Sequence, residues 1–326
     1  MNMTKILVTG ASGFVGIHML DALVSGSRTV IALHNRPLAE HLRDRYKGKV
    51  TWRQVDIVND DLSAVVADID TVYHLAAYAS NSESSEDVAL MEQVNILGTQ
   101  RLSFASRNAG VRHFIFVSSV AAGSNVFDEE DVLSLSPYGR SKREAEAKCL
   151  ELSTTDFGVT VLRPSALFGE YHEGSVYELV KVINQRRFFM VGDGRNRTNF
   201  YYIGDFIELL LLLEHKDEVY GQIFVACVEP WQLKNLVLEI EMLLGVNHMR
   251  WHVPVFVGYL AGFSCDIIRY LTGYSLPLSS RRIRAMQQDI AYSANRLEAT
   301  LKFKPKFGLK DGLRRTISWF RKEDLL

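Results

Sequence analysis

Short apolar runs alternate with longer amphipathic segments along the first half of the chain. Helix-like segments begin near Phe14, Asp61, Glu86 and Tyr138. Between them lie six runs with the length and the β-branched, aromatic composition of strands: 5–10, 29–34, 50–56, 71–77, 113–119 and 159–165. Continuous apolar strands separated by helices are typical of a parallel sheet covered on both faces and wound by right-handed crossovers. The pattern therefore predicts an α/β fold with a doubly wound parallel sheet.

The second half of the chain has a different pattern. After residue 165, turn-rich pieces such as 191–199 alternate with helical runs such as 205–216 and 232–245. We therefore expect two parts. A sheet domain would occupy residues 1–165, and a smaller, mostly helical lobe would occupy residues 166–326 and be partly interleaved with the sheet domain.

Composition and charge exclude several classes of function. The 326 residues are 47% hydrophobic and 23% charged, and their net charge of −1 gives no electrostatic argument for binding nucleic acid or an acidic membrane surface. The cysteines Cys149, Cys227 and Cys265 are odd in number and far apart, so we expect neither a disulfide framework nor a metal site. A reducing, cytoplasmic location is favoured, and no secretory signal is visible.

The longest apolar stretch runs from Val253 to Cys265 and is followed by Asp266. Its 13 residues are fewer than the ~20 that a membrane-spanning helix needs. We therefore expect no integral membrane segment, but a hydrophobic helix that is buried or lines an apolar pocket, with peripheral membrane contact as the lesser alternative.

A glycine-rich turn follows the first strand. It has the spacing Gly-x-x-Gly-x-x-Gly and opens a helix with apolar periodicity, which is the context of a dinucleotide-binding turn and therefore of a Rossmann domain. Such a turn lets the backbone approach a pyrophosphate, which the amides and dipole of the helix N-terminus then hold. The cofactor contacts expected here are Gly10, Ser12, Gly13, Phe14, Val15 and Gly16.

The adenosine end of the cofactor should lie where the second and third strands end. No acid occurs among His34, Asn35 and Arg36, and an arginine here would bind a 2′-phosphate. NADP is therefore favoured, NAD stays possible, and the alternative for Arg36 is a solvated loop residue. Further cofactor contacts are expected from the ends of the third and fourth strands: Asp56 and Ile57 at the adenine, and Leu75, Ala76 and Ala77 where small residues allow close approach.

Tyr138 and Lys142 stand four residues apart in a helix-like segment, so their side chains would share one face. A solvated helix face is the alternative. Ser118 and Ser119 end the fifth strand, at the sheet edge where ligands of such folds bind. Together, these features resemble the extended branch of the short-chain dehydrogenase/reductase superfamily, the NAD-dependent epimerases and dehydratases. The resemblance rests on the glycine turn, the serine pair, Tyr-x-x-x-Lys and the segments "TGASGFVG", "HLAA", "YGRSK" and "LRPSALFG".

The resemblance implies a role for each residue of this set. Ser119 would hydrogen-bond the substrate oxygen, and Tyr138 would act as acid and base. Lys142 would lower the pKa of Tyr138 and bind the nicotinamide ribose. The resemblance also implies that Asn95 supports the cofactor site and that Arg163 contacts the cofactor. The alternative for Asn95 is a polar residue whose hydrogen bonds are satisfied within its own helix. His74 is interpreted as a structural residue at a strand end.

The substrate is less sharply indicated. The resemblance implies oxidation or reduction of a secondary hydroxyl or ketone of a nucleotide sugar, by a 4-keto reductase or a 4-epimerase that forms a homodimer. Two departures weaken the case that a nucleotide diphosphate is bound in the family's usual manner. Ala166 stands where an asparagine is usual, and Thr198 occupies a usual arginine site, with Arg197 one position away. A 3β-hydroxysteroid dehydrogenase-like enzyme for hydrophobic alcohols is the alternative, and a non-catalytic dinucleotide sensor is a third.

Overall fold

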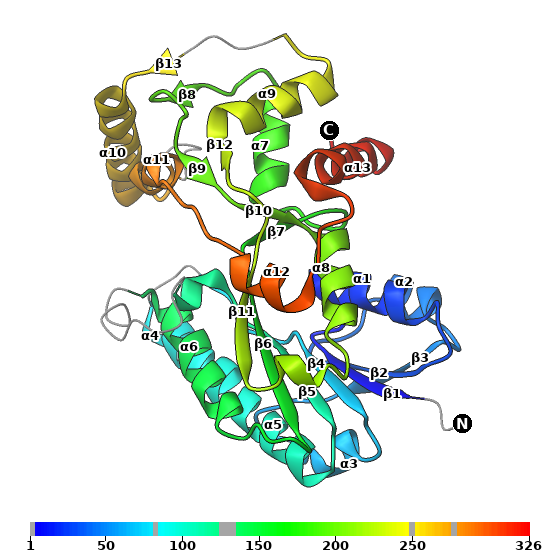
Figure 1. The fold of residues 1–326 in the computed structure, drawn as a ribbon. Helices are drawn as coiled ribbons and strands as arrows, with labels where there is room; N and C mark the ends of the chain where they lie inside the picture. Colours follow the sequence, from blue (N-terminus) through cyan, green and yellow to red (C-terminus); the bar gives the residue numbers. More distant parts are fainter. Residues whose placement is uncertain (1–3, 81–83, 124–134, 248–251, 275–278) are drawn as a thin grey trace. The chain divides into compact units, whose positions relative to one another are not determined.

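The computed structural model describes residues 4–80, 84–123, 135–247, 252–274 and 279–326 (Figure 1). The chain forms two compact units. The first, called the sheet unit below, contains Met1–Ser165, Ile203–Ala226 and Ala294–Lys306. The second unit contains Ala166–Tyr202, Cys227–Ser293 and Phe307–Leu326. Two segments that follow residue 165 therefore belong to the sheet unit, including the apolar helix that begins at Ile203.

A seven-stranded sheet forms the centre of the sheet unit, with the order β11-β6-β5-β4-β1-β2-β3 and all pairs parallel. The strands are β1 (Lys5–Thr9), β2 (Thr29–His34), β3 (Val50–Gln54), β4 (Thr71–His74), β5 (His113–Val117), β6 (Gly158–Pro164) and β11 (Gln222–Ala226). The order reverses between β1 and β4, which creates the crevice where such sheets bind ligands. The predicted doubly wound parallel sheet is thus confirmed.

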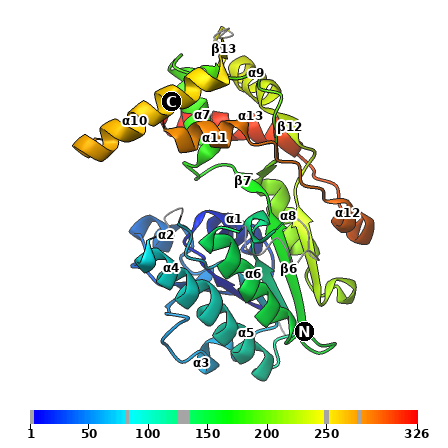
Figure 2. The same cartoon turned by 90° about the vertical axis from the view of Figure 1, so that its left-hand side faces the viewer.

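Helices cover both faces of this sheet. In Figures 1 and 2, α5 and α6 lie side by side on one face, and α1 and α8 lie together on the other. The helical elements of the sheet unit are α1 (Phe14–Leu23), α2 (Glu40–Arg45), α3 (Ser63–Val66), α4 (Ser85–Met91), the π-helix η1 (Glu92–Gly98), α5 (Thr99–Asn108), the 3₁₀ turn η2 (Val120–Ala122), α6 (Pro137–Leu150), α8 (Ile203–Leu212), η4 (Asp217–Val219) and α12 (Asn295–Leu301).

Burial explains which strands the apolar pattern could predict. Strands β4 and β6 are buried at every position, and Phe114 and Val161 of β5 and β6 belong to the core between the sheet and its helices. The seventh strand, β11, was not among the six predicted. It lies at the sheet edge beside β6 and is only partly buried.

The second unit is mostly helical, as the sequence predicts for the C-terminal region. Its helices are α7 (Ser175–Asn184), α9 (Leu233–Leu244), α10 (Val255–Thr272), α11 (Ser280–Gln287) and α13 (Gly308–Lys322). Short strand pairs link them: β7 (Ala166–Phe168) with β10 (Phe200–Tyr202), β9 (Arg197–Thr198) with β12 (Trp231–Gln232), and β8 (Met190–Val191) with β13 (His252–Val253).

Helix α10 corrects one expectation. The sequence predicts a buried helix or a pocket lining in this region, but α10 is 18 residues long and most of its large apolar side chains are exposed. Its buried positions are Gly258 and Gly262. Apolar composition alone does not distinguish a helix packed on all sides from one packed on a single narrow face.

Candidate active site

The glycine turn is packed as a dinucleotide cradle requires. Gly10 has a φ of +61°, and a Cβ there would lie 2.8 Å from the backbone nitrogen of Ala76. A Cβ on Gly16 would lie 2.3 Å from the Gly10 carbonyl oxygen. Side chains would thus close the space between the β1 turn, the loop after β4 and the start of α1. Gly13, the N-cap of α1, has no side chain to cap the helix, so the helix N-terminus can interact with an anion.

The loop after β4 is held by a buried network that the sequence pattern did not reveal. The Thr9 hydroxyl accepts hydrogen bonds from the backbone N–H groups of Leu75 and Ala76, at 3.1 and 3.0 Å. Its oxygen also lies 2.8 Å from Nδ1 of His74, and Nε2 of His74 lies 2.8 Å from the Thr99 hydroxyl. The network fixes Leu75 and Ala76 beside the glycine turn, while Ala77 is exposed.

His74 is a structural residue in this network, in agreement with its interpretation from the sequence. Its side chain is fully buried, and burial, with a further effect from the charge of Lys142, lowers the pKa of His74 to about 3. Because the Thr9 oxygen already accepts two N–H groups, its own proton donates to Nδ1 of His74. The imidazole is then neutral, with its proton on Nε2.

The predicted adenosine contacts lie at the ends of β2 and β3. Arg36 and Asn35 are exposed, whereas the buried ring of His34 binds the Arg36 carbonyl oxygen through Nδ1, at 2.8 Å. The Asp56 carboxylate accepts hydrogen bonds from the N–H of Val58 and the side chain of Asn59, and these bonds lower the pKa of Asp56. Asp56 is therefore held in its charged form as a hydrogen-bond acceptor.

Four other predicted contacts occupy different settings. Ser12 is exposed, and Phe14 and Val15 are half-buried at the start of α1. Ile57 is buried, and its side chain packs against Gly98. A Cβ added at Gly98 would lie 2.9 Å from the Ile57 side chain. Ile57 therefore shapes the wall between the end of β3 and η1.

The elements that carry Ser119 and Tyr138 pack directly against each other. Ser119 is the N-cap of η2, and its hydroxyl accepts a hydrogen bond from the N–H of Ala121, at 3.1 Å. Helix α6 begins with Ser136 as N-cap and Pro137 in the first turn, so Tyr138 lies in that first turn. A Cβ at position 139 would lie 2.1 Å from the Ala121 carbonyl oxygen, so the glycine there lets α6 pack directly against the turn that carries Ser119.

Lys142 is buried to 1% exposure one helical turn after Tyr138. Its ammonium donates a hydrogen bond to the Val117 carbonyl oxygen at 2.8 Å and lies 4.3 Å from the centroid of the Phe116 ring. Burial lowers the pKa of Lys142 to about 8, against an opposing effect of Glu146. The amine is therefore anchored at the carboxyl end of β5 and can exchange its proton near neutral pH.

The phenol of Tyr138 is buried in the protein without its cofactor. Lys142 and the positive nicotinamide ring are expected to lower the pKa of Tyr138 together, and without that ring burial raises the pKa of Tyr138 above its ordinary value of 10. The ammonium of Lys142 is engaged with Val117, so loss of water around the phenol dominates. The protein without its cofactor therefore keeps Tyr138 protonated.

Arg163 lies in a different setting from the one that the resemblance implies. Its guanidinium is buried and forms an ion pair with the buried Glu146 of α6, with Nε 2.9 Å from the carboxylate. A further hydrogen bond runs from Nη1 to the Gly123 carbonyl oxygen, at 2.6 Å. These bonds tie β6 to α6 and to the end of η2, so Arg163 positions the elements that carry Ser119 and Tyr138.

Asn95 crosslinks three elements instead of being satisfied within its own helix. It lies buried in the π-helix η1, a type of distortion frequent at functional sites. Its amide exchanges hydrogen bonds with the backbone N–H and carbonyl of Tyr78 and donates to the Ser141 hydroxyl at 2.9 Å. Ser141 in turn donates to the Tyr138 carbonyl oxygen. Asn95 therefore links the loop after β4 to the helix turn that carries Tyr138.

Two buried hydroxyls at the same sheet edge point to a ligand. Within the part of the chain that the structure describes, neither the Oγ of Ser118 nor that of Ser165 has a hydrogen-bond partner. These residues follow the adjacent strands β5 and β6, and the Ser118 N–H donates to the Leu162 carbonyl of β6. A buried unpaired hydroxyl costs about 1–3 kcal/mol, which a bound polar ligand would recover. With the glycine cradle, these residues fit a dinucleotide and a sugar hydroxyl.

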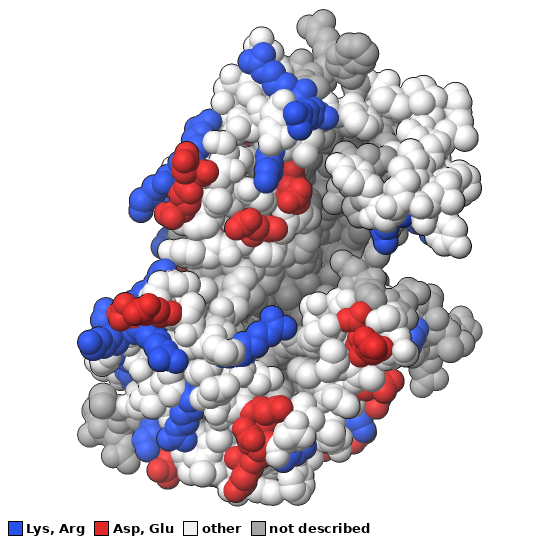
Figure 3. Space-filling view, turned by 180° about the vertical axis from the view of Figure 1, so that it is seen from behind, with Lys and Arg blue, Asp and Glu red and all other residues white. Residues whose placement is uncertain are grey.

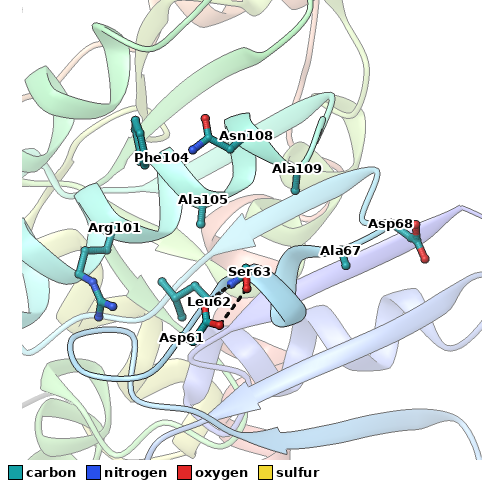
Figure 4. Close-up of a pocket in the computed structure, with 10 residues that line it drawn as sticks. All are labelled: Asp61, Leu62, Ser63, Ala67, Asp68, Arg101, Phe104, Ala105, Asn108 and Ala109. Atoms are coloured by element: carbon teal, nitrogen blue, oxygen red, sulfur yellow. Dashed lines mark hydrogen bonds between the residues drawn. The ribbon is translucent and has the colours of Figure 1, made fainter.

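A separate surface hollow lies between α3 and α5 and contains none of the predicted site residues (Figure 4). Its lining includes Asp61 and Ser63, which hydrogen-bond one another, and the exposed Phe104. Arg101 also lines it, and its guanidinium donates to the backbone oxygens of Ile57 and Val58. We assign the hollow no part in the chemistry.

Within the second unit, Arg197, which lies one position from the usual arginine site, is already paired. Arg197 lies in β9, and its guanidinium forms a two-bond ion pair with Asp289, with Nη2 2.7 Å from the carboxylate. The hydrogen bond from Arg197 lowers the pKa of Asp289 to about 2. A diphosphate at Arg197 would therefore compete with a carboxylate.

Comparison with known proteins identifies the family. The model of the NAD dependent epimerase/dehydratase family matches residues 6–227, which include every element around Ser119, Tyr138 and Lys142. The chain belongs to this family. A relative in Escherichia coli O157:H7, the N-acetyl-alpha-D-glucosaminyl-diphospho-ditrans,octacis-undecaprenol 4-epimerase, is 30% identical over 325 residues, 97% of this chain and 95% of the relative.

Other members of the family agree with this fold. The UDP-glucose 4-epimerase of Vibrio cholerae is 24% identical over 334 residues, 97% of this chain and 95% of the relative. The crystal structure of UDP-glucuronic acid 4-epimerase from Bacillus cereus, with UDP-glucuronic acid and NAD, has a TM-score of 0.73 at 24% identity and covers 98% of this chain and 100% of its own. The chain is therefore an epimerase/dehydratase-type short-chain dehydrogenase/reductase, as its motifs predict.

Proposed function

We propose that the protein is a dinucleotide-dependent 4-epimerase of a sugar that is carried on a diphosphate. The observation that carries the proposal is the assembly of Ser119, Tyr138 and Lys142 at the carboxyl edge of β5, in a chain that matches a 4-epimerase over nearly its whole length. The unpaired hydroxyls of Ser118 and Ser165 at the same edge support a polar ligand there.

Tyr138 is the proton carrier in this proposal. When bound, the dinucleotide supplies a reversible acceptor for the hydride from C4 of the sugar. Tyr138, as phenolate, takes the proton of the C4 hydroxyl while Ser119 donates a hydrogen bond to the same oxygen and holds it in place. Once the 4-keto sugar presents its other face, Tyr138 would give its proton back to the oxygen as the sugar is reduced again. The reaction changes neither the number of protons nor the cofactor's net oxidation state.

Lys142 prepares Tyr138 for this exchange. Burial alone raises the pKa of the phenol, so the protein needs a positive charge close by to stabilise the phenolate. The ammonium of Lys142 lies one helical turn away with its charge held by the Val117 carbonyl. We propose that it turns toward the cofactor ribose and Tyr138 when the site fills.

For the cofactor, we propose that NADP is accepted and preferred. The exposed Arg36 at the end of β2, with no acid at positions 34–36, supports binding of a 2′-phosphate. The Bacillus cereus neighbour holds NAD. The test is the ratio of the dissociation constants for NADPH and NADH.

For the carrier, we propose a polyprenyl diphosphate in preference to a nucleoside diphosphate. The relative with 30% identity acts on a sugar joined through a diphosphate to undecaprenol. Ala166 and the Arg197–Asp289 pair support the same choice, because both depart from the usual grip on a nucleotide diphosphate. UDP-sugars are the second candidate, since the Vibrio cholerae and Bacillus cereus relatives are named for them.

The decisive experiment offers N-acetylglucosaminyl-diphospho-polyprenol and UDP-N-acetylglucosamine separately and follows the 4-epimer by chromatography. Product formed with oxidised dinucleotide and without net appearance of NADPH supports the epimerase. A 4-keto reductase would leave both sugars unchanged, because their C4 carries a hydroxyl, and would consume NADPH stoichiometrically only when a 4-keto sugar is offered. Tyr138→Phe should lower turnover by about 10²–10⁴-fold with cofactor binding retained. Turnover that survives this change would overturn the assignment, and activity on a hydroxysteroid alone would favour the hydrophobic-alcohol enzyme.

We further propose that the protein is a cytoplasmic homodimer. Leu90, Leu97 and Phe104 are exposed at intervals of seven residues along α4, η1 and α5, which follow one another without a break. Exposed apolar side chains on three consecutive helical elements support packing against a second copy.

A further inference from the structure

Helix α10 carries an apolar surface that the epimerase reaction does not use. In this fully described helix the two buried residues are glycines, Gly258 and Gly262. Phe256, Leu260 and Phe263 are 67, 62 and 61% exposed. Monomeric proteins rarely leave so many large apolar side chains together in water, and such patches mark interaction surfaces.

The exposed residues form one continuous stripe. Phe256, Leu260, Phe263, Ile267 and Leu271 follow one another at intervals of four, three, four and four residues, which places them on one face of the helix. Tyr270 and Tyr274 extend the stripe at its C-terminal end, at 89 and 69% exposure. In Figure 3, which shows the molecule from behind, the part of the surface formed by α10 is largely free of charged side chains.

The opposite face of α10 is fixed to the second unit. A Cβ on Gly258 would lie 2.8 Å from the side chain of Val191, and one on Gly262 would lie 2.8 Å from the backbone nitrogen of Ser280 at the start of α11. The carboxylate of Asp266 accepts hydrogen bonds from the N–H and the hydroxyl of Ser280. One face is thus packed and hydrogen-bonded, and the stripe faces away from it.

The sequence around the stripe is positively charged. Between residues 250 and 284 it has five arginines, at 250, 269, 281, 282 and 284, and one acid, Asp266, so the formal charge of this segment is +4. Among the side chains that the structure describes, Arg269 and Arg284 are exposed, and Arg269 lies on the same side of α10 as Gly262, away from the stripe. An apolar face in a basic segment complements a bilayer that contains anionic lipids, because the apolar residues enter the acyl boundary while the positive charge of the segment attracts the head groups.

We propose that α10 docks this protein on the surface of an anionic lipid bilayer, lying in the plane of the interface. A spanning orientation does not fit, because one face of the helix is bound to α11 and carries Asp266. By length and composition alone the helix could cross a bilayer, so its packed face and Asp266 decide against that orientation. Tyr270 and Tyr274 suit the head-group level, where aromatic residues with a polar tip gather.

The test is sedimentation of the full chain with vesicles, without any sugar substrate, so its outcome does not depend on the proposed epimerase activity. Vesicles of phosphatidylethanolamine and phosphatidylglycerol are compared with vesicles of phosphatidylcholine. The variant Leu260→Gln/Phe263→Gln removes two side chains of the stripe. The matched control, Leu238→Gln/Met242→Gln, removes two exposed apolar side chains from α9, at 44 and 66% exposure.

The wild type and the α9 variant should bind the phosphatidylglycerol vesicles equally, and the α10 variant about thirtyfold more weakly. Binding to phosphatidylcholine should be weaker for all three proteins. The proposal is overturned if the wild type does not sediment with either vesicle, or if the α9 and α10 variants lose binding alike. It is also overturned if the α10 change alters only the mass in light scattering, since a second copy would then cover the stripe.

Discussion

The buried cation at Lys142 allows a sharp test of the active-site electrostatics. Replacing it with methionine keeps an unbranched side chain of similar length and removes the charge. We expect Lys142→Met to abolish epimerisation, because the phenolate of Tyr138 loses its nearest cation. We also expect the variant to be more stable than the wild type near neutral pH, because the wild type must bury an ammonium group at 1% exposure.

The size of this effect follows from the pKa of Lys142, which burial lowers from 10.5 to about 8. Below pH 8 the amine is protonated in the folded and the unfolded chain, and the cost of burying the charge is fully present. Between pH 8 and 10.5 the unfolded chain binds more protons, so the stability of the wild type rises with pH. At about 1.4 kcal/mol per pKa unit, the wild type should gain roughly 2.5 kcal/mol relative to Lys142→Met between pH 7 and pH 10.

Urea unfolding of both proteins at pH 7, 8, 9 and 10 measures this gain. Groups other than Lys142 are common to both proteins and cancel in the difference, provided that they do not interact with it. Lys148→Met, on the more exposed side of the same helix, is the control and should show a much smaller dependence on pH. A difference in unfolding free energy between the two proteins that stays constant from pH 7 to pH 10 would refute the claim that desolvation controls Lys142.

Three further changes test other parts of the structure. Arg163→Met should lower the free energy of unfolding by about 3–5 kcal/mol, because it leaves Glu146 buried without its partner. The double variant Arg163→Met/Glu146→Met should recover most of this loss, and a double variant as unstable as the single one would contradict the reasoning. Arg36→Ala should raise the dissociation constant for NADPH about tenfold with NADH unchanged, and equal losses for both would remove Arg36 from the 2′-phosphate site. Leu97→Glu/Phe104→Glu should halve the mass in light scattering, and an unchanged dimer would place the interface elsewhere.

The sequence predicted features that depend on local spacing. The turn at Gly10 and the Tyr138–Lys142 pair each lie within a few residues of one strand or helix, where period and turn chemistry determine the geometry. The strands that are buried on both faces, such as β4 and β6, were recognisable because such burial requires continuous apolar runs. Ser119 could be placed at the sheet edge for the same reason, since it follows a buried strand directly.

Features that depend on distant partners were not predictable in this way. Arg163 meets Glu146 across 17 residues, and Asn95 meets Ser141 across 46, so no local pattern distinguishes a positioning residue from one that contacts the cofactor. The exposure of α10 is also a tertiary property. The net charge of −1 for the whole chain likewise does not reveal that residues 250–284 carry a formal charge of +4.

The two proposals meet in one kinetic experiment. A sugar on a polyprenyl diphosphate is confined to the bilayer, so docking by α10 would raise the enzyme's local concentration at its substrate without touching the chemistry. Leu260→Gln/Phe263→Gln should therefore raise KM at least tenfold for a long-chain substrate presented in phosphatidylglycerol vesicles. For a water-soluble short-chain analogue, the same variant should keep the wild-type kcat and KM. Equal loss on both substrates would mean that the stripe serves the active site or the fold instead of the membrane.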